Sequence, residues 1–311
     1  MPFTKKNILI TGACGQLGNE LRLILSNDNY IKLFLTDIVD KNNLSFSDSS
    51  NYYQLDITNL QLVKSFVAEH KIDVLINCAA YTNVDKAETD YETADLINNK
   101  AVENLALACA DNNILMIHVS TDYVFGGDEE RNTPYKEDDL VNPLGVYGKT
   151  KLAGEESIKR ILNDYIILRT AWLYSIFGNN FVKTMLRLTS ERETISVVAD
   201  QVGTPTYAKD LADVIYKIIK NEQELRGEKI RGIYNFTDEG ICSWYDFAKE
   251  IAFLSKSKCV VSPCTSLEYG SKVKRPKYSV LSKEKIKKSL NIEIPNWEDS
   301  LKVMLNNMKY E

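Results

Sequence analysis

Short hydrophobic runs alternate with longer segments of helical periodicity along the first half of the chain. Three of the runs are nearly continuous, as in parallel strands that are covered on both faces. The predicted strands are residues 7–11, 32–36, 73–77, 115–120 and 165–169, and the predicted helices are residues 16–26, 60–70, 92–112 and 150–162. This alternation of strands and helices predicts an α/β fold with a doubly wound parallel sheet.

Two of the predicted helices begin at capping signals. Thr58 and Gln61 are spaced as in a capping box, and Ser243 with Asp246 opens a helix over residues 244–254. After about residue 170, glycine and proline separate shorter elements, and an amphipathic helix is predicted over residues 283–290. We therefore predict one domain over residues 1–170. Residues 171–311 are predicted to form mainly a smaller C-terminal lobe, with some segments that return to the sheet.

The composition excludes several classes of protein. The 311 residues are 44% hydrophobic and 26% charged, which is typical of a globular protein. A net charge of −5 disfavours nucleic acid as a partner, because phosphate binding needs a basic surface. We find no apolar stretch of signal-peptide or membrane-spanning length, so we predict a cytoplasmic protein with no membrane partner. Irregular spacing of the cysteines and histidines predicts no metal site.

A glycine-rich loop follows the first predicted strand. Gly12, Gly15 and Gly18 have the spacing Gly-x-x-Gly-x-x-Gly, which permits a tight turn, close approach of the backbone to a pyrophosphate and close packing of helix on strand. The free N–H groups at the start of the next helix attract an anion. The loop therefore predicts a Rossmann-like dinucleotide-binding domain over residues 1–170. Glycines that only turn the chain are the alternative.

Carboxylates follow the next two extended segments. Asp37 lies 19 residues after Gly18, where it could accept hydrogen bonds from the adenosine ribose hydroxyls and would repel a 2′-phosphate. This position favours NADH over NADPH, and a solvated strand end is the alternative. Asp56 and Ile57 end the third extended run, where they could hold the adenine.

Tyr147 and Lys151 are spaced as i and i+4, which places them on one face if the segment is helical. An ammonium beside a phenol lowers the pKa of the tyrosine, which makes it a better acid or base near neutral pH. Ser120 and Thr121 end the fourth predicted strand, at the edge where ligands bind in such sheets. A hydroxyl there could share a substrate oxygen with Tyr147. A turn that only leaves the strand is the alternative.

These features resemble the extended short-chain dehydrogenase/reductases and, more narrowly, the dTDP-4-dehydrorhamnose reductase family. The matching stretches are residues 15–18, 77–88, 120–125, 147–152, 169–174, 203–206 and 275–276, in family order over nearly the whole chain. The resemblance implies that the 4-keto group of dTDP-4-dehydro-β-L-rhamnose is reduced to give dTDP-β-L-rhamnose, with NADPH or NADH as cofactor. It also implies that residues 171–311 mainly bind this nucleotide sugar. The sequence leaves open whether the protein is a monomer or a homodimer.

The resemblance also implies roles for individual residues. Tyr147 matches the catalytic tyrosine, Lys151 its partner, Thr121 the active-site hydroxyl and Asn98 an asparagine that organises water. Further cofactor contacts are implied for Gly15, Gln16, Leu17, Asp56, Ile57, Ala80, Tyr81 and Thr82. Substrate contacts are implied for Asp122 and Trp172, although Trp172 could equally be a core residue below the site.

Two charged features allow more than one interpretation. Some members of the family form dimers through magnesium held by glutamates. Glu20 matches one such position, but the cation Lys209 stands at a second, so no metal is predicted. A basic cluster consists of Lys272, Lys274, Arg275 and Lys277. This cluster is either a solvated loop or a site for the diphosphate of the nucleotide sugar, for which Arg275 has the suitable forked geometry.

Two alternative functions share these motifs. One is a sister nucleotide-sugar epimerase or reductase that acts on a different sugar. The other is a non-catalytic regulatory homologue, against which the intact Tyr147, Lys151 and Thr121 argue.

Overall fold

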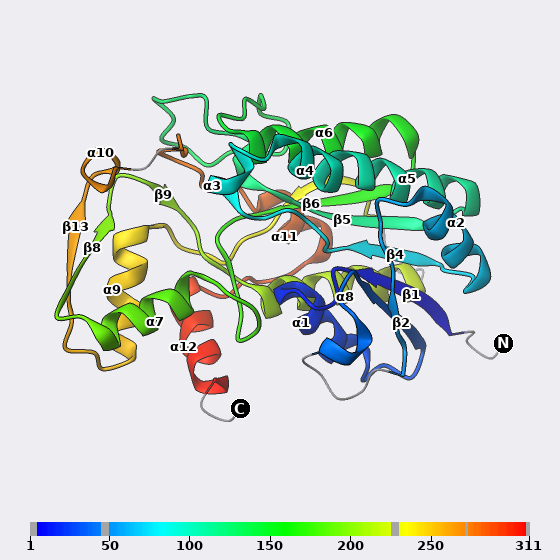
Figure 1. The fold of residues 1–311 in the computed structure, drawn as a ribbon, viewed down its shortest axis with the longest axis horizontal. Helices are drawn as coiled ribbons and strands as arrows, with labels where there is room; N and C mark the ends of the chain where they lie inside the picture. Colours follow the sequence, from blue (N-terminus) through cyan, green and yellow to red (C-terminus); the bar gives the residue numbers. More distant parts are fainter. Residues whose placement is uncertain (1–4, 45–49, 225–229, 271–272, 309–311) are drawn as a thin grey trace.

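A seven-stranded parallel sheet forms the centre of the fold (Figure 1). The structure is a computed structural model that describes residues 5–44, 50–224, 230–270 and 273–308. The strand order is β3-β2-β1-β4-β5-β6-β11. The strands are β1 (Lys6–Thr11), β2 (Ile31–Asp37), β3 (Tyr52–Gln54), β4 (Val74–Asn77), β5 (Leu115–Thr121), β6 (Tyr165–Thr170) and β11 (Gly232–Asn235). The predicted doubly wound α/β fold is confirmed.

Helices cover both faces of the sheet because successive residues of a strand point to opposite sides. Ile8 and Ile10 of β1 belong to the core under α1 (Gln16–Leu25), α8 (Ala208–Glu224) and α11 (Glu284–Leu290). Leu9 points the other way, into the core under α2 (Leu60–Glu69), α5 (Ala101–Asn112) and α6 (Val146–Ile161). Figure 1 shows α2, α5 and α6 above the sheet and α1 and α8 below it.

Two of the predicted helices differ in the structure. The capping box predicted at Thr58 is absent, because the Thr58 hydroxyl donates to Asp56 Oδ1 at 2.7 Å. Asn59 caps α2 instead, by accepting from the Leu62 N–H at 3.2 Å. The helix predicted over residues 92–112 has three parts: α4 (Tyr91–Asp95), the π-helical η2 (Leu96–Lys100) and α5.

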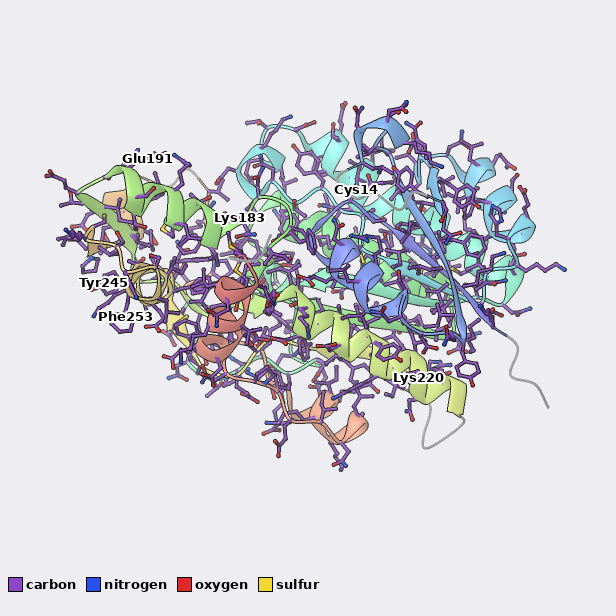
Figure 2. The ribbon with its side chains drawn as sticks, turned by 90° about the horizontal axis from the view of Figure 1, so that it is seen from below. Cys14, Lys183, Glu191, Lys220, Tyr245 and Phe253 are labelled. Carbon is purple, nitrogen blue, oxygen red and sulfur yellow. The ribbon has the colours of Figure 1, made fainter. Side chains whose placement is uncertain are left out.

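A second group of elements forms a lobe beside the sheet. It comprises α7 (Phe181–Glu191), β8 (Thr194–Val198), α9 (Trp244–Leu254), β13 (Val260–Cys264), α10 (Ser266–Tyr269) and α12 (Trp297–Asn307). Its own apolar core includes Tyr174, Phe247 and Trp297. The predicted capping box of Ser243 and Asp246 is present at the start of α9. Figure 2 places Glu191 and Phe253 in this lobe, far from Lys220 of α8.

Candidate active site

The glycine-rich loop joins β1 to α1 at the carboxyl edge of the sheet. Gly12 has a φ of +67°, and a Cβ there would lie 2.6 Å from the Ala79 backbone nitrogen. A Cβ at Gly18 would overlap the Gly12 carbonyl, so α1 packs directly on the loop. Gly15 is the N-cap of α1 and provides no side-chain cap, which leaves the first helical N–H groups for an anion. The loop thus fits the pyrophosphate of a dinucleotide.

The loop opens into a cleft of about 1010 Å³. The cleft lies where β1 is flanked by β2 and β4, the switch point at which doubly wound sheets bind ligands. Most of the residues proposed from the sequence line it: Gly12, Gly15, Gln16, Leu17, Gly18, Asp37, Asp56, Ile57, Ala80, Thr82, Thr121, Asp122, Tyr147, Lys151, Trp172 and Arg275. Residues from remote parts of the chain therefore meet in one space.

Tyr147 and Lys151 lie on α6, which begins at Val146 rather than at the predicted residue 150. The earlier start has a long-range cause, because Glu88 Oε1 accepts from the Val146 N–H at 2.8 Å. Both side chains are therefore helical and share one face. The Tyr147 phenol and the Thr121 hydroxyl share a hydrogen bond, which brings α6 and the end of β5 together at the cleft.

The protonation of this pair differs from the sequence-based expectation. Burial raises the pKa of Tyr147 to about 12 and lowers the pKa of Lys151 to about 8. Lys151 Nζ donates to the Val119 carbonyl at 2.7 Å. The lowered tyrosine pKa that the spacing predicted is thus not found, because burial raises the pKa more than the hydrogen bond with Thr121 lowers it. Tyr147 carries its proton at neutral pH.

Asp122 is a buried carboxyl beside this pair. Its Oδ1 accepts from the Thr121 hydroxyl at 3.0 Å. Burial raises the pKa of Asp122 to about 7, and hydrogen bonds, including the one with Thr121, oppose that rise. Asp122 therefore orients the Thr121 hydroxyl and changes charge close to neutral pH.

Two proposed residues, Asn98 and Tyr81, do not line the cleft. Asn98 is completely buried in η2 and donates to the Tyr81 carbonyl at 3.1 Å and to the Thr150 hydroxyl at 3.2 Å. The Tyr81 phenol donates to Asp90 Oδ2 at 3.1 Å. In the structure Asn98 ties the segment after β4 to α6. Its role in organising water, and a cofactor contact of Tyr81, stay predictions.

Asp37 ends β2 at the rim of the cleft. Its Oδ2 accepts from the Cys14 N–H at 3.0 Å and its Oδ1 from the Ile38 N–H at 2.8 Å. Two backbone donors thus fix the carboxylate, and each oxygen keeps a further acceptor position for a ribose hydroxyl.

The sequence analysis missed an aromatic pair in the cleft. Trp172, with a φ of +47°, stacks on Trp244 with ring centroids 3.5 Å apart and planes at 10°. Trp244 is the first residue of α9 and lies 72 positions away in the chain. The loop residues Asn179 and Asn180 were also missed. Asn180 donates to Gln16 Oε1 at 3.0 Å beside the glycine-rich loop.

A second cavity, of about 730 Å³, adjoins the cleft. Trp244 and Arg275 line both spaces. Apolar side chains of α7 and β8 form one wall, and polar groups such as Arg192 and Gln201 are also part of the lining. The cleft and this cavity together provide room for a ligand with two bulky ends.

The basic cluster is mostly solvated. Lys274 and Lys277 have highly exposed side chains and pair with Glu129, and Lys272 lies outside the described residues. Arg275 differs from them, because its Nη2 donates to both carboxylate oxygens of Asp85 at 2.7 and 2.9 Å at the edge of the cleft.

The two residues at the matched magnesium positions have other partners. Glu20 is buried and accepts from the Ser175 hydroxyl at 2.6 Å, and Lys209 forms an ion pair with Asp213 at 2.8 Å. Across the part of the chain that the structure describes, no three His, Cys, Asp or Glu side chains gather as a metal site would require. None of the described helices combines the length and the apolarity needed to cross a bilayer.

A tyrosine and a lysine one helical turn apart, across a cleft from a glycine-rich loop, can hold a nicotinamide dinucleotide next to a proton donor. On this doubly wound sheet, the arrangement defines a short-chain dehydrogenase/reductase. More narrowly, the chain belongs to the RmlD substrate binding domain family, whose model matches residues 6–310.

Relatives of known name agree with this assignment. A dTDP-4-dehydrorhamnose reductase of Aggregatibacter actinomycetemcomitans is 41% identical over 303 residues, which cover 95% of this chain and 97% of the relative. A crystal structure of a dTDP-4-dehydrorhamnose reductase from Clostridium acetobutylicum is 43% identical, with a TM-score of 0.86 over 97% of this chain and 99% of that one. The Bacillus anthracis enzyme in complex with NADP is 39% identical, with a TM-score of 0.86 over 98% and 100%.

Proposed function

We propose that this protein reduces the 4-keto group of dTDP-4-dehydro-β-L-rhamnose to give dTDP-β-L-rhamnose, with NADPH or NADH. The observation that carries the proposal is the hydrogen bond between Tyr147 and Thr121 in the cleft that also contains the glycine-rich loop. The similarity to named reductases over nearly the full chain supports the choice of substrate.

The side chains of the site can perform the proton transfer. When bound, the nicotinamide supplies a hydride to C4 of the sugar. As negative charge develops on the carbonyl oxygen, Tyr147 gives that oxygen its phenolic proton. The Thr121 hydroxyl, which donates to Asp122 Oδ1 in the structure, turns in this scheme to donate its hydrogen bond to the same oxygen. Lys151 binds the nicotinamide ribose in this scheme.

The cleft provides a consistent place for the dinucleotide. The N–H groups at the start of α1 bind its pyrophosphate, and Gln16 and Leu17 lie beside them. Asp37 accepts from the adenosine ribose, and Asp56 and Ile57 hold the adenine. Ala80 and Thr82 line the path toward Tyr147.

Asp37→Asn should shift cofactor preference toward NADPH. The substitution keeps an oxygen for the Cys14 N–H but removes the charge that repels a 2′-phosphate. We expect the ratio of the NADPH and NADH dissociation constants to change by about tenfold in favour of NADPH, equivalent to about 1.4 kcal/mol. Fluorescence titration with each cofactor measures this ratio. An unchanged ratio would mean that Asp37 does not bind the adenosine ribose and is only a solvated residue at the end of a strand.

The nucleotide end of the substrate fits the second cavity. Residues 171–311 supply most of its lining, which supports a mainly substrate-binding role for them. The sugar then lies against Trp172, and the diphosphate passes Arg275, which borders both spaces. A guanidinium has five N–H donors, so Arg275 can bind a phosphate oxygen while it remains paired with Asp85.

Arg275→Ala should raise KM for the sugar nucleotide about tenfold or more, since a lost charged hydrogen bond costs about 1.5–3 kcal/mol. The diphosphate is remote from C4, so kcat and the KM of the dinucleotide should hardly change. Lys274→Ala is the matched control, because Lys274 belongs to the same cluster but pairs with Glu129 at the surface. Equal KM values for the two variants in steady-state kinetics would mean that Arg275 does not bind the substrate.

Cofactor oxidation with the dTDP-4-keto sugar separates the proposed function from its alternatives. We expect the sugar to be turned over with NADPH or NADH when the two are tested side by side. A sister enzyme would instead turn over a different nucleotide sugar. A non-catalytic homologue would bind cofactor without oxidising it.

A further inference from the structure

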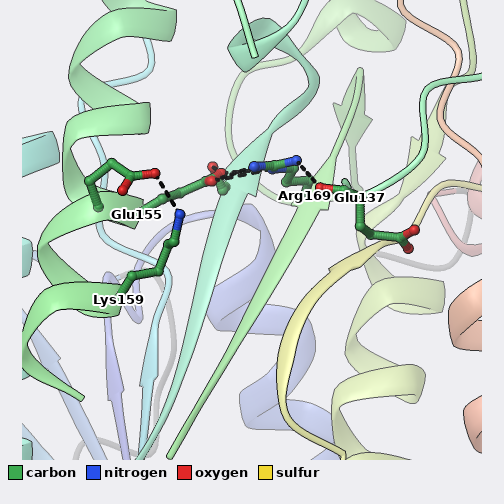
Figure 3. Close-up of polar contacts among 6 residues, drawn as sticks. Glu137, Glu155, Lys159 and Arg169 are labelled. Carbon is green, nitrogen blue, oxygen red and sulfur yellow. Dashed lines mark hydrogen bonds and ion pairs between the residues drawn. The ribbon is translucent and has the colours of Figure 1, made fainter. Parts of the chain in front are cut away.

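A buried ion pair lies beneath the cleft. The Glu155 side chain is 0% exposed and that of Arg169 is 3% exposed. Arg169 Nη2 donates to Glu155 Oε2 at 2.7 Å, and Arg169 Nε donates to Glu155 Oε1 at 3.0 Å (Figure 3). A buried ion pair adds little stability over an apolar pair of similar volume. Its position next to the site therefore needs a functional explanation.

The spacing on α6 aligns Glu155 with the catalytic pair. Tyr147, Lys151 and Glu155 are i, i+4 and i+8, so they lie on one face in successive turns. Glu155 Oε1 also accepts from the Ser120 hydroxyl at 2.5 Å, and Ser120 immediately precedes Thr121 on β5. The carboxylate thus lies one turn below Lys151.

Arg169 is held from several sides, which fixes the carboxylate it binds. Its Nη1 donates to the Glu137 carbonyl at 3.2 Å, and its guanidinium lies over the Phe125 ring at 5.0 Å. Figure 3 shows Arg169 between Glu155 and Glu137. The negative charge of Glu155 therefore has a fixed position relative to α6 and β5.

We propose that Glu155 is a positioning residue whose fixed carboxylate holds Lys151 in its ammonium form at the wall of the cleft. The inference rests on the proposed function and deepens it, because it assigns a cause to the charge of the lysine that holds the nicotinamide ribose.

Three other titratable groups face Lys151. His118 of β5 has its Nε2 3.4 Å from Lys151 Nζ, and burial holds its pKa well below the usual value. Cys78, just after β4, has a pKa that burial raises to about 12, and Tyr147 is likewise protonated at neutral pH. These three groups are neutral at pH 7. Glu155 is therefore the negatively charged residue that acts on Lys151.

Burial and Glu155 act in opposite directions on the pKa of Lys151, which gives the direction of the change expected when Glu155 is replaced. Burial disfavours the ammonium and lowers the pKa of Lys151, whereas Glu155 opposes this most strongly of the groups that raise it. Removing the carboxylate charge leaves burial unopposed by Glu155, so we expect the pKa of Lys151 to fall.

An NMR titration of the full-length protein, labelled with ¹³C at the lysine ε-carbons, tests the proposal. Lys151→Met identifies the Lys151 signal by its loss. Glu155→Gln should lower the midpoint of that signal by about one pH unit or more. Glu156→Gln is the matched control, because Glu156 is the next residue of α6 but is 53% exposed and pairs with Lys159. The control should titrate as the wild type does.

Two results would overturn the proposal: the same midpoint in Glu155→Gln as in the wild type, or an equal shift in Glu156→Gln. If Glu155→Gln does not fold because Arg169 has lost its partner, the double variant with Arg169→Gln removes both charges and should still lower the midpoint, because Glu155, and not Arg169, is among the groups that shift the pKa of Lys151. An unshifted double variant would contradict the proposal equally. The titration contains no sugar nucleotide, so a wrong substrate assignment would leave its result unchanged.

Discussion

Tyr147→Phe is expected to lower kcat by about 10²–10⁴, the usual contribution of a general acid. The phenol lies in the cleft and shares a hydrogen bond with Thr121, and burial raises its pKa to about 12. The protonated form that the reaction needs is therefore present throughout the neutral range. Phenylalanine keeps the ring and removes only the proton donor. Cofactor affinity should stay nearly unchanged, which fluorescence titration can check alongside steady-state kinetics.

Tyr216→Phe is the control for this substitution. The Tyr216 phenol donates to Asp28 Oδ2 at 3.0 Å and is outside the lining of the cleft, so its removal should leave kcat close to that of the wild type. If Tyr147→Phe kept more than about a tenth of the wild-type kcat, Tyr147 would not be the acid.

Gly12→Ala is expected to lower the free energy of unfolding by about 2–5 kcal/mol, as the sum of a left-handed backbone penalty and overpacking. Gly12 has a φ of +67°, and a Cβ there would lie 2.6 Å from the Ala79 backbone nitrogen and 2.8 Å from its Cα. Backbone atoms cannot move aside as a flexible side chain can. β1 and β4 would have to separate, and the cofactor site between them would be lost as well.

Gly270→Ala isolates the backbone part of this cost. Gly270 has a φ of +70°, but a Cβ there would meet nothing within 4 Å. Its destabilisation should be confined to the backbone penalty of about 1–2 kcal/mol. Chemical denaturation of both variants measures the difference. Equal losses would mean that the close approach of the loop to Ala79 is not needed for stability.

Local patterns were sufficient to predict the centre of the fold. The hydrophobic runs predicted the five strands β1, β2, β4, β5 and β6, because buried parallel strands are continuous in sequence. β3 was predicted only as the extended run that ends at Asp56 and Ile57, and β11 was not predicted. Both lie at edges of the sheet and are only partly buried, so neither forms a continuous apolar run.

The sequence was sufficient to predict those site residues that directly follow a strand or are spaced to lie on one face of a helix. Long-range contacts determine the other features of the site. Glu88 starts α6 at Val146, Trp244 reaches Trp172 from α9, and Asn98 is held between Tyr81 and Thr150. Burial determines the protonation of Tyr147 and Lys151, and depth in a fold cannot be derived from the spacing of two residues.

The most direct test of the account is transfer of deuterium from 4-deuterated NADPH to dTDP-4-dehydro-β-L-rhamnose, with the product analysed by NMR. Hydride transfer to C4 predicts dTDP-β-L-rhamnose that carries the deuterium on C4. The Tyr147→Phe variant should form the same product slowly. A product of different configuration at C4, deuterium at another carbon, or no consumption of the deuterated cofactor would contradict the proposed reaction.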